Sequence, residues 1–354
     1  MRSGQLRVAV VGAGYWGPNL VRNFRSSVSW DLAAVCDLDV AKARALVGDR
    51  PDVACVPSLG QVLAMEDVDA VAIATPARTH HPIAMAALRA GKHVLVEKPL
   101  AETTVHGREM VDTAAAEGLV LMADHTYCYT PAVLKIRELV AAGELGEILF
   151  IDSVRINLGL VQPDVDVFWD LAPHDLSVFD AILPGGLRPL GVAANGADPL
   201  GAGKSCIGYL TLPLEGGGMA HVHVNWLSPT KIRQMVIGGT KRTLVWDDLN
   251  PQQRVSVYDR GVDLVHQSAS TPERNAATIS YRLGDTWAPA LPEKEPLSSM
   301  VQEFADSIRE LRAPRTDGAA GLRVLSVLEA ARRSLATGGA MADVVRHGAL
   351  EVVA

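Results

Sequence analysis

The sequence predicts an α/β protein with two domains: a doubly wound parallel sheet in residues 1–125, and an α+β domain with a large, mainly antiparallel sheet in residues 126–354. A chain of 354 residues exceeds the size that one hydrophobic core usually organises. In the first part, short β-branched runs alternate with helical stretches, which is typical of a parallel sheet covered by helices. In the second part, strand-like runs follow one another with turns between them, which favours antiparallel pairing.

The first domain is expected to alternate strands with helices. The expected strands are Arg7–Val11, Leu32–Cys36, Val68–Ala74, His93–Val96 and Leu119–Ala123. The expected helices are Gly17–Arg25, Val40–Val47, Leu59–Ala64, Pro82–Ala90 and Thr104–Glu117. Such nearly continuous apolar strands are buried on both faces, so helices are expected on both sides of the sheet.

The second domain is expected to begin with a helix, Pro131–Ala142, and to continue mainly as strands. The expected strands are Ile148–Ile156, Leu187–Asn195, Cys206–Leu212, Met219–Trp226, Arg233–Gly238, Thr243–Trp246 and Arg254–Tyr258. Two stretches with apolar residues at helical spacing, Ser298–Leu311 and Gly321–Thr337, close the chain. We expect these last helices to pack back toward the first domain.

Composition excludes several classes of function. The net charge of -7 is spread along the chain and Lys and Arg form no dense cluster, so nucleic acid is not expected as a partner. No apolar run approaches the roughly 20 residues needed to span a bilayer, and no basic-then-apolar leader precedes the first strand. The widely spaced cysteines and the histidines show no metal-ligand pattern, which predicts reduced thiols, a cytoplasmic protein and no metal site.

A glycine motif follows the first expected strand and opens the first expected helix. It consists of Gly12, Ala13, Gly14, Tyr15, Trp16 and Gly17, and satisfies GxGxxG. In this position the first glycine permits a tight turn, the second lets the backbone approach a pyrophosphate, and the third lets the helix pack on its strand. Free backbone N–H groups at the helix start then bind the phosphates. The motif predicts a dinucleotide-binding Rossmann domain.

Asp37 ends the second expected strand, where a carboxylate can accept hydrogen bonds from the hydroxyls of the adenosine ribose. A 2′-phosphate would be repelled there, by on the order of 4 kcal/mol per charge pair at an effective dielectric of about 20. The nearest basic residues, Lys42 and Arg44, belong to the following helix. NAD is therefore expected rather than NADP. The alternative role of helix cap suits Asp39 better than Asp37.

Lys98 follows the fourth expected strand, within Glu97-Lys98-Pro99. Ligands of open α/β sheets bind outside the carboxyl ends of the strands, so Lys98 is expected to face the cofactor crevice. A lysine at a strand end is commonly a solvated surface residue, and the Glu-Lys-Pro context is what makes this one informative.

With these segments, the chain resembles the glucose–fructose oxidoreductase and inositol dehydrogenase (Gfo/Idh/MocA) family over essentially its full length. The matching segments are Gly12–Gly17, Ala74-Thr75-Pro76 with His80 downstream, Glu97-Lys98-Pro99, and Trp169-Asp170-Leu171-Ala172-Pro173-His174-Asp175. The resemblance implies an NAD-dependent dehydrogenase that oxidises a secondary hydroxyl of a sugar, sugar nucleotide or cyclitol. It also implies that Lys98, Asp170 and His174 correspond to the catalytic lysine, aspartate and histidine of inositol dehydrogenases.

The chemistry of these residues agrees with that assignment. Asp170 and His174 are four residues apart, which places them on one face of a helix with Pro173 expected in its first turn. An imidazole with an ordinary pKa of about 6.5 suits removal of a proton from an alcohol. Lys98 can stabilise the developing alkoxide, and Asp170 can orient substrate or tune the pKa values of its neighbours. The alternative is a helix-capping Asp170 and an incidental His174.

Other residues are weaker candidates. Thr75, Pro76, His80 and Glu97 are expected to border the cofactor together with Lys98. Candidate substrate contacts are His125, Trp169, Lys231 and Arg233.

Alternative functions are a ketosugar reductase using the same residues in reverse, a hydride shuttle between two sugars with a tightly held cofactor, and a catalytically silent cofactor-bound regulatory protein. The shuttle enzymes carry an export leader and prefer NADP, and neither feature is expected of this chain. The resemblance implies a homodimer or homotetramer formed through the sheet of the second domain, and an exposed sheet face commonly means association.

Overall fold

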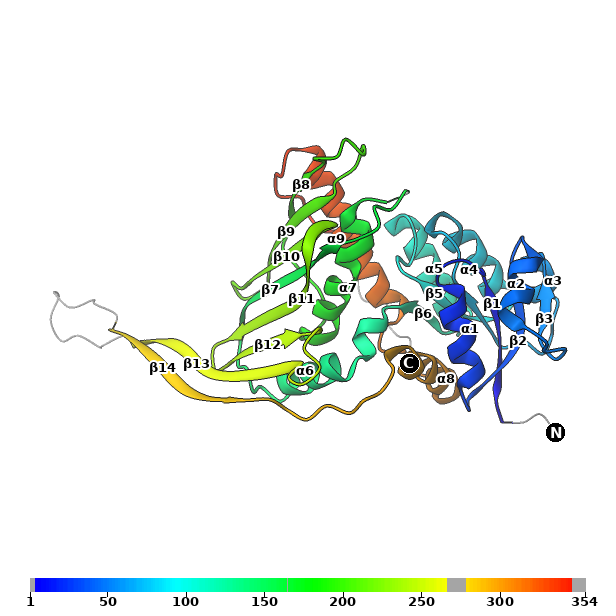
Figure 1. Cartoon of the computed structure of the whole chain (residues 1–354), viewed down its shortest axis with the longest axis horizontal. Coiled ribbons are helices and arrows are strands. Elements are labelled where there is room, and N and C mark those ends of the chain that lie inside the picture. The colour runs from blue at the N-terminus through cyan, green and yellow to red at the C-terminus, as the bar shows by residue number, and fades with distance from the viewer. Residues whose placement is uncertain (1–3, 164, 266–277, 346–354) are drawn as a thin grey trace.

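The computed structural model describes residues 4–163, 165–265 and 278–345, and contains two sheets with helices packed on and between them (Figure 1). The first sheet has six parallel strands in the order β3-β2-β1-β4-β5-β6. Its strands are β1 (Leu6–Val11), β2 (Trp30–Cys36), β3 (Ala54–Val56), β4 (Ala70–Ile73), β5 (His93–Glu97) and β6 (Leu121–Asp124). Its helices are α1 (Gly17–Ser26), α2 (Val40–Val47), α3 (Leu59–Leu63), α4 (His80–Arg89) and α5 (Thr104–Ala116). The predicted doubly wound sheet is confirmed, and the short edge strand β3 is an addition.

The central strand β1 illustrates why this sheet is buried on both faces. Val8 and Val10 pack into one hydrophobic cluster, and Ala9 and Val11 into another on the opposite face. The strand order reverses between β1 and β4, because the chain passes first to one side of β1 and then to the other. Ligands of such sheets bind at this reversal, outside the carboxyl ends of the strands.

The second sheet has eight strands in the order β14-β13-β12-β11-β7-β10-β9-β8. They are β7 (Ile148–Leu158), β8 (Ala193–Ala197), β9 (Ile207–Pro213), β10 (Met219–Asn225), β11 (Leu227–Gly239), β12 (Thr243–Asp247), β13 (Val255–Val265) and β14 (Thr278–Trp287). Only β7 and β10 pair in parallel, so the mainly antiparallel sheet is confirmed. One face packs on α6 (Pro131–Ala141), α7 (Val167–Ile182) and α9 (Gly318–Ala336) in a large apolar core.

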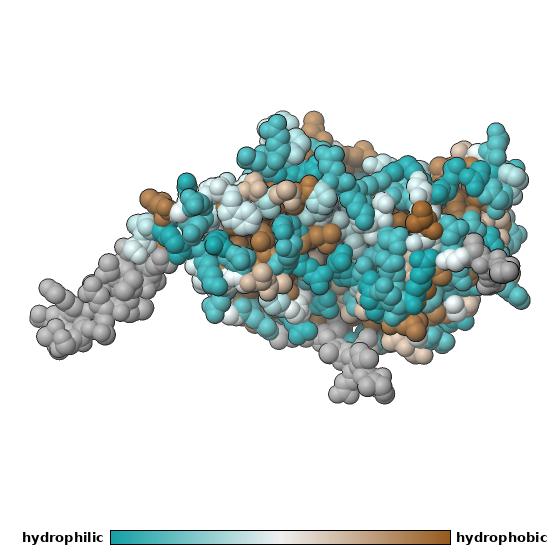
Figure 2. Space-filling model, turned by 90° about the horizontal axis from the view of Figure 1, so that it is seen from below, coloured by the Kyte–Doolittle hydropathy of each residue, from teal (hydrophilic) through white to brown (hydrophobic). Residues whose placement is uncertain are grey.

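Three predictions for this sheet were wrong in their bounds. The strand expected at Arg233–Gly238 already begins at Leu227, with a register irregularity between Leu227 and Ile232. The strand expected at Leu187–Asn195 begins only at Ala193, because Pro189 cannot donate to a ladder and Leu187 N–H is bonded to the Asp180 carboxylate instead. The strand expected at Arg254–Tyr258 continues to Val265 and pairs with β14, which was not predicted. These two strands form an arm that extends from the body (Figures 1 and 2). The start of β13 is buried at Val255 and Val257, whereas most described side chains of the arm from Arg260 onward are exposed, so burial does not mark where these strands run.

The closing helices connect the two sheets. Helix α8 (Pro296–Glu310) packs on the first sheet, where the Trp30 ring stacks on Phe304 at 5.2 Å and Trp30 Nε1 donates to the Val301 carbonyl at 2.7 Å. Helix α9 contacts both α5 and α7, and Glu329 on it accepts hydrogen bonds from the backbone and hydroxyl of Thr104. None of the helices in the described ranges is long and apolar enough to cross a membrane.

Helix α7 differs from the prediction in one detail. Asp166 caps it, accepting from Trp169 N at 3.0 Å, and the helix begins at Val167. Pro173 therefore lies inside the helix rather than in its first turn. Because proline has no N–H, the carbonyl of Trp169 lacks its helical partner at this point. Asp170 and His174 still share one face of the helix.

Candidate active site

The loop between β1 and α1 has the shape of a phosphate cradle. Gly12 has a φ of +105°, and a Cβ at this position would lie 2.6 Å from the Ala74 carbonyl oxygen. A Cβ at Gly17 would lie 2.2 Å from the Gly12 carbonyl oxygen, so both positions require glycine. At Gly14 a Cβ would have no atom within 4 Å, because this residue borders open space. The loop therefore fits the pyrophosphate of a dinucleotide, which needs close approach to the backbone.

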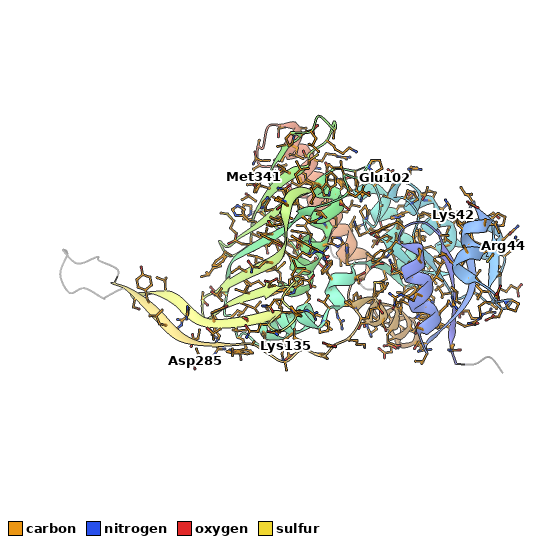
Figure 3. The ribbon with its side chains drawn as sticks, viewed as in Figure 1. Lys42, Arg44, Glu102, Lys135, Asp285 and Met341 are labelled. Atoms are coloured by element: carbon orange, nitrogen blue, oxygen red, sulfur yellow. The ribbon has the colours of Figure 1, made fainter. Side chains whose placement is uncertain are left out.

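Asp37 joins this loop to the end of β2. Its Oδ2 accepts from Ala13 N at 2.7 Å and its Oδ1 from Asp39 N at 2.9 Å. Asp39 itself caps α2 by accepting from Ala41 N, as its sequence position suggested. Figure 3 shows Lys42 and Arg44 on α2, at the end of the molecule farthest from the second sheet. Each Asp37 oxygen keeps a lone pair that can accept from a ribose hydroxyl.

Two carboxyl groups lie side by side at the carboxyl ends of β5 and β6, where Glu97 is the register partner of Asp124. Asp124 Oδ2 accepts from Trp16 Nε1 at 2.7 Å, which fixes the indole of the glycine loop against β6. Glu97 Oε2 accepts from Lys98 N at 2.6 Å. Burial, together with the neighbouring Asp124, raises the pKa of Glu97 to about 8, and burial also raises the pKa of Asp124. The pair therefore retains a proton at neutral pH.

Lys98 meets Asp170 across the two halves of the molecule. Lys98 Nζ donates to the Asp170 carbonyl at 3.0 Å and lies 3.5 Å from its Oδ1, and both side chains are largely buried. Asp170 Oδ2 accepts from Trp226 Nε1 at 3.0 Å, between β10 and β11. Each carboxylate oxygen of Asp170 thus has a partner, and Asp170 holds the ammonium group of Lys98 in place.

His174 lies one turn beyond Asp170 on α7. Burial and the nearby charges of Lys98 and Arg155 hold the pKa of His174 well below 6.5. The imidazole is therefore neutral at pH 7, and neither of its ring nitrogens bonds to another residue in the described part of the chain. A neutral imidazole beside a fixed ammonium group provides a proton acceptor and a hydrogen-bond donor for one substrate hydroxyl.

Tyr127, in the 3₁₀ turn η2 (Thr126–Tyr129) after β6, packs edge-on against His174 with ring centroids 5.1 Å apart. The Arg155 guanidinium lies over the Tyr127 ring at 4.4 Å, and Arg233 Nη1 donates to the Tyr127 hydroxyl at 2.8 Å. Arg155 is held in turn by Asp175 through two hydrogen bonds of 2.9 and 3.0 Å, with both side chains 3% exposed. This network forms one wall beside His174.

A comparison with known families finds a match to the first domain. Residues 6–125 match the model of the GFO_IDH_MocA family, described as an oxidoreductase family with an NAD-binding Rossmann fold. Residues 6–125 therefore form an NAD-binding Rossmann domain of the Gfo/Idh/MocA oxidoreductase family.

Several known proteins are similar to this chain. UDP-N-acetylglucosamine 3-dehydrogenase of Acidithiobacillus ferrooxidans is 28% identical over 324 residues, which covers 91% of this chain and 94% of that protein. Its solved structure superposes with a TM-score of 0.79 over 94% of this chain and 99% of that chain, at 26% identity. GenD2 from gentamicin A biosynthesis, solved in complex with NAD, superposes with a TM-score of 0.78 at 25% identity, covering 98% of each chain. D-glucoside 3-dehydrogenase of Escherichia coli (strain K12) is 35% identical over 149 residues, or 42% of each chain.

The remaining family-motif residues lie around the same crevice. His80 is 1% exposed, with Nδ1 2.8 Å from the Pro99 carbonyl oxygen and Nε2 2.8 Å from that of Thr75. It therefore joins the end of β4 to the loop that carries Lys98, and both ring nitrogens contact backbone. The Thr75 hydroxyl accepts from Thr79. Contact of Thr75, Pro76 and His80 with the cofactor stays a prediction.

The four weaker substrate candidates lie in different surroundings. Arg233 belongs to the network through its bond to Tyr127, whereas Lys231 is exposed. His125 is 2% exposed, its ring nitrogens lack a hydrogen-bond partner among the described residues, and burial lowers its pKa to about 4. Trp169 lies under the Arg332 guanidinium of α9 at 5.8 Å, between the two halves of the molecule. Only Arg233 is joined to the group around His174 by a direct hydrogen bond.

Several members of the site were not predicted from the sequence: Asp124, Tyr127, Arg155 and Trp226. Nothing in the local pattern around Tyr127 or Arg155 distinguishes either from an ordinary turn or strand residue. A weak signal existed for Asp124, because an acidic residue at the end of an apolar strand is unusual in a sheet buried on both faces.

Proposed function

We propose that this protein is an NAD-dependent dehydrogenase that oxidises a secondary hydroxyl of a sugar, sugar nucleotide or cyclitol. The observation that carries the proposal is the pairing of Lys98 with Asp170 beside a His174 that is neutral at pH 7. The relatives that act on sugars and sugar nucleotides support the substrate class. The same residues serve the reverse reduction, because an acid and a base exchange roles when the reaction is reversed.

In this mechanism His174 takes the proton of the substrate hydroxyl, and the Lys98 ammonium donates a hydrogen bond to the oxygen as negative charge develops there. Asp170 positions Lys98 through the carbonyl and carboxylate contacts. When bound, NAD supplies the hydride acceptor. The positive charges of Lys98 and Arg155 disfavour a protonated His174, which favours rapid release of the proton after each turnover.

The cradle of Gly12, Gly14 and Gly17, with Asp37 beside it, would hold NAD. We infer a preference for NAD over NADP, because a 2′-phosphate would face the Asp37 carboxylate and Lys42 and Arg44 lie on the outer helix α2 (Figure 3).

We further propose that the protein is a cytoplasmic homodimer or homotetramer, associated through the outer face of the second sheet. Phe150, Tyr209 and Met219 are exposed on neighbouring strands of that face. Tyr281 and Leu283 are exposed on the β13–β14 arm, which stands out from the body (Figure 2). Exposed hydrophobic groups of this kind mark association surfaces. Light scattering at micromolar concentration tests this, and a mass of only about 38 kDa, the single chain of 37.7 kDa, would contradict it.

The activity is tested with a panel of substrates containing UDP-N-acetylglucosamine, free hexoses, methyl glucosides, aminosugars and inositols. Formation of NADH is followed by absorbance with each compound and NAD. At least one compound is expected to give turnover that Lys98→Ala abolishes. Absence of NADH formation with every compound, from protein shown by calorimetry to bind NAD, would contradict the dehydrogenase assignment while leaving the cofactor site intact.

A further inference from the structure

Tyr127 connects the two halves of the candidate active site. It belongs to the turn that follows β6, at the end of the parallel sheet, and its side chain contacts residues of the second sheet and of α7. Its ring touches His174 and Arg155, its hydroxyl touches Arg233, and Trp246 lies at 6.1 Å between ring centroids. The side chain is partly exposed, although all these neighbours surround it.

The hydroxyl group of Tyr127 has a hydrogen that remains free for donation. Arginine has only donors, so the bond from Arg233 Nη1 uses a lone pair of the phenol oxygen and not its hydrogen. No residue in the described ranges accepts that hydrogen. The ring nitrogens of the adjacent His174 also have no protein partner there. One fixed donor and one free acceptor therefore belong to two side chains whose ring centroids lie 5.1 Å apart.

We propose that Tyr127 is a substrate-positioning residue, whose hydroxyl, fixed by Arg233, donates a hydrogen bond to the substrate hydroxyl next to the one that is oxidised. This arrangement selects a vicinal diol: one hydroxyl gives its proton to His174 and its neighbour accepts from Tyr127. The inference rests on the proposed function and narrows its substrate class. A positioning role accounts for the two arginines at Tyr127, of which Arg155 lies over the ring and Arg233 bonds to the hydroxyl. Each of these arginines is paired with an aspartate.

Tyr127→Phe tests the proposal, because it keeps the ring contacts with His174 and Arg155 and removes only the hydroxyl. A lost neutral hydrogen bond of about 1 kcal/mol corresponds to a roughly 5-fold loss of binding. We expect KM for the best panel substrate to rise about 5- to 10-fold, with a smaller change in kcat, since the contact is made in the ground state as well. The dissociation constant of NAD should stay within twofold.

Tyr129→Phe is the matched control. Tyr129 lies two residues away in the same turn, is 1% exposed, and its hydroxyl bonds to Thr316 Oγ1 at 3.0 Å. Its loss should lower the melting temperature and leave KM within twofold. A structural role for Tyr127 would make the two variants behave alike, whereas a substrate contact separates them.

Monodeoxy analogues of the best substrate provide the decisive comparison. For the wild-type enzyme, kcat/KM with the analogue that lacks the neighbouring hydroxyl should be about 5- to 10-fold lower than with the complete substrate. For Tyr127→Phe, the same comparison of the two substrates should show a loss of no more than twofold. An unchanged KM in Tyr127→Phe would overturn the role of Tyr127, and so would an equal loss of kcat/KM with the analogue in both enzymes. Neither result would affect the dehydrogenase assignment. A wild-type enzyme that turns over no panel compound contradicts the dehydrogenase assignment and the role of Tyr127 together.

Discussion

The proposed cofactor side and the proposed substrate side of the site are built in different ways. The cofactor side consists of one six-residue loop and one aspartate, and its shape depends on the positive φ of Gly12 and on the close approach of Gly17 to the Gly12 carbonyl. The substrate side consists of side chains from five distant segments: Lys98, Tyr127, Arg155, Asp170 with His174, and Trp226. A local loop is specified by its own residues, whereas a network of side chains exists only after both sheets have formed. Substitutions in the network are therefore expected to be coupled.

The sharpest test of this division removes the groups that act on the substrate. Lys98→Ala and His174→Ala should each lower kcat by a factor of about 10² to 10⁴. NAD affinity, measured by calorimetry, should change only a few fold, because it depends on the glycine loop and Asp37. Lys135→Ala, a substitution on α6 far from the crevice, serves as the control (Figure 3). Near-normal turnover in His174→Ala would transfer the role of base to another group, with Lys98 the next candidate.

The converse test changes the cofactor side alone. Asp37→Ser removes the charge that repels a 2′-phosphate, and the ratio of the dissociation constants of NADP and NAD should fall by about 100-fold. This is less than the roughly 4 kcal/mol of the unscreened pair, since solvent and salt weaken the repulsion. The control is Asp39→Ser, which keeps a capping hydroxyl on α2. Equal affinities of the unmodified protein for the two cofactors would contradict the role of Asp37.

The Glu97–Asp124 pair lies between the two sides, and its titration gives a test of stability. The pKa of Glu97 rises from 4.5 to about 8 on folding, so the folded state keeps a proton that the unfolded state loses in this range. Glu97 therefore costs stability as pH rises from 4.5 to 8, by at most about 1.4 kcal/mol per pH unit, and nothing further above pH 8.

Glu97→Gln should remove that dependence, because the amide still accepts from Lys98 N and carries no charge. Urea unfolding at pH 5, 6, 7 and 8 should show the variant gaining stability relative to the wild type at each step. Glu102→Gln, at an exposed position close in sequence (Figure 3), removes the same charge and should run parallel to the wild type. A constant difference between Glu97→Gln and the wild type would indicate that the pair is ionised throughout.

The smallest effect is expected from the indole that supports Asp170. Trp226→Phe removes the donor to Asp170 Oδ2 and should lower kcat/KM about 5-fold, since one hydrogen bond is lost but the contact with Lys98 remains. Trp30→Phe is the control, because it also removes one indole donor, that of Trp30 Nε1 to the Val301 carbonyl, between the first sheet and α8. Equal effects of the two substitutions would mean that the Trp226 bond does not position Asp170.

The sequence by itself determined the fold class, the glycine loop, Asp37 and the segments that carry Lys98, Asp170 and His174. Each depends on relations within a few residues: β-branched runs between helices, a turn that only glycine permits, a carboxylate at a strand end, and helical spacing of four residues. Asp170 and His174 share one face of α7 as expected, although Pro173 lies farther inside the helix than predicted, because the helix continues past the proline.

Only the tertiary structure decided the arm of β13 and β14, the carboxyl pair and the wall around Tyr127. Beyond Tyr258 the arm is mainly exposed, so its strands are defined by their pairing with each other and not by burial, although apolar residues still alternate at Tyr281 and Leu283. Glu97 and Asp124 are separated by a helix, and their adjacency follows from strand order. Tyr127 meets Arg155, His174 and Arg233 because the second sheet and α7 pack beside the end of β6. Contacts between distant segments depend on how the sheets are placed, and no local pattern specifies that placement.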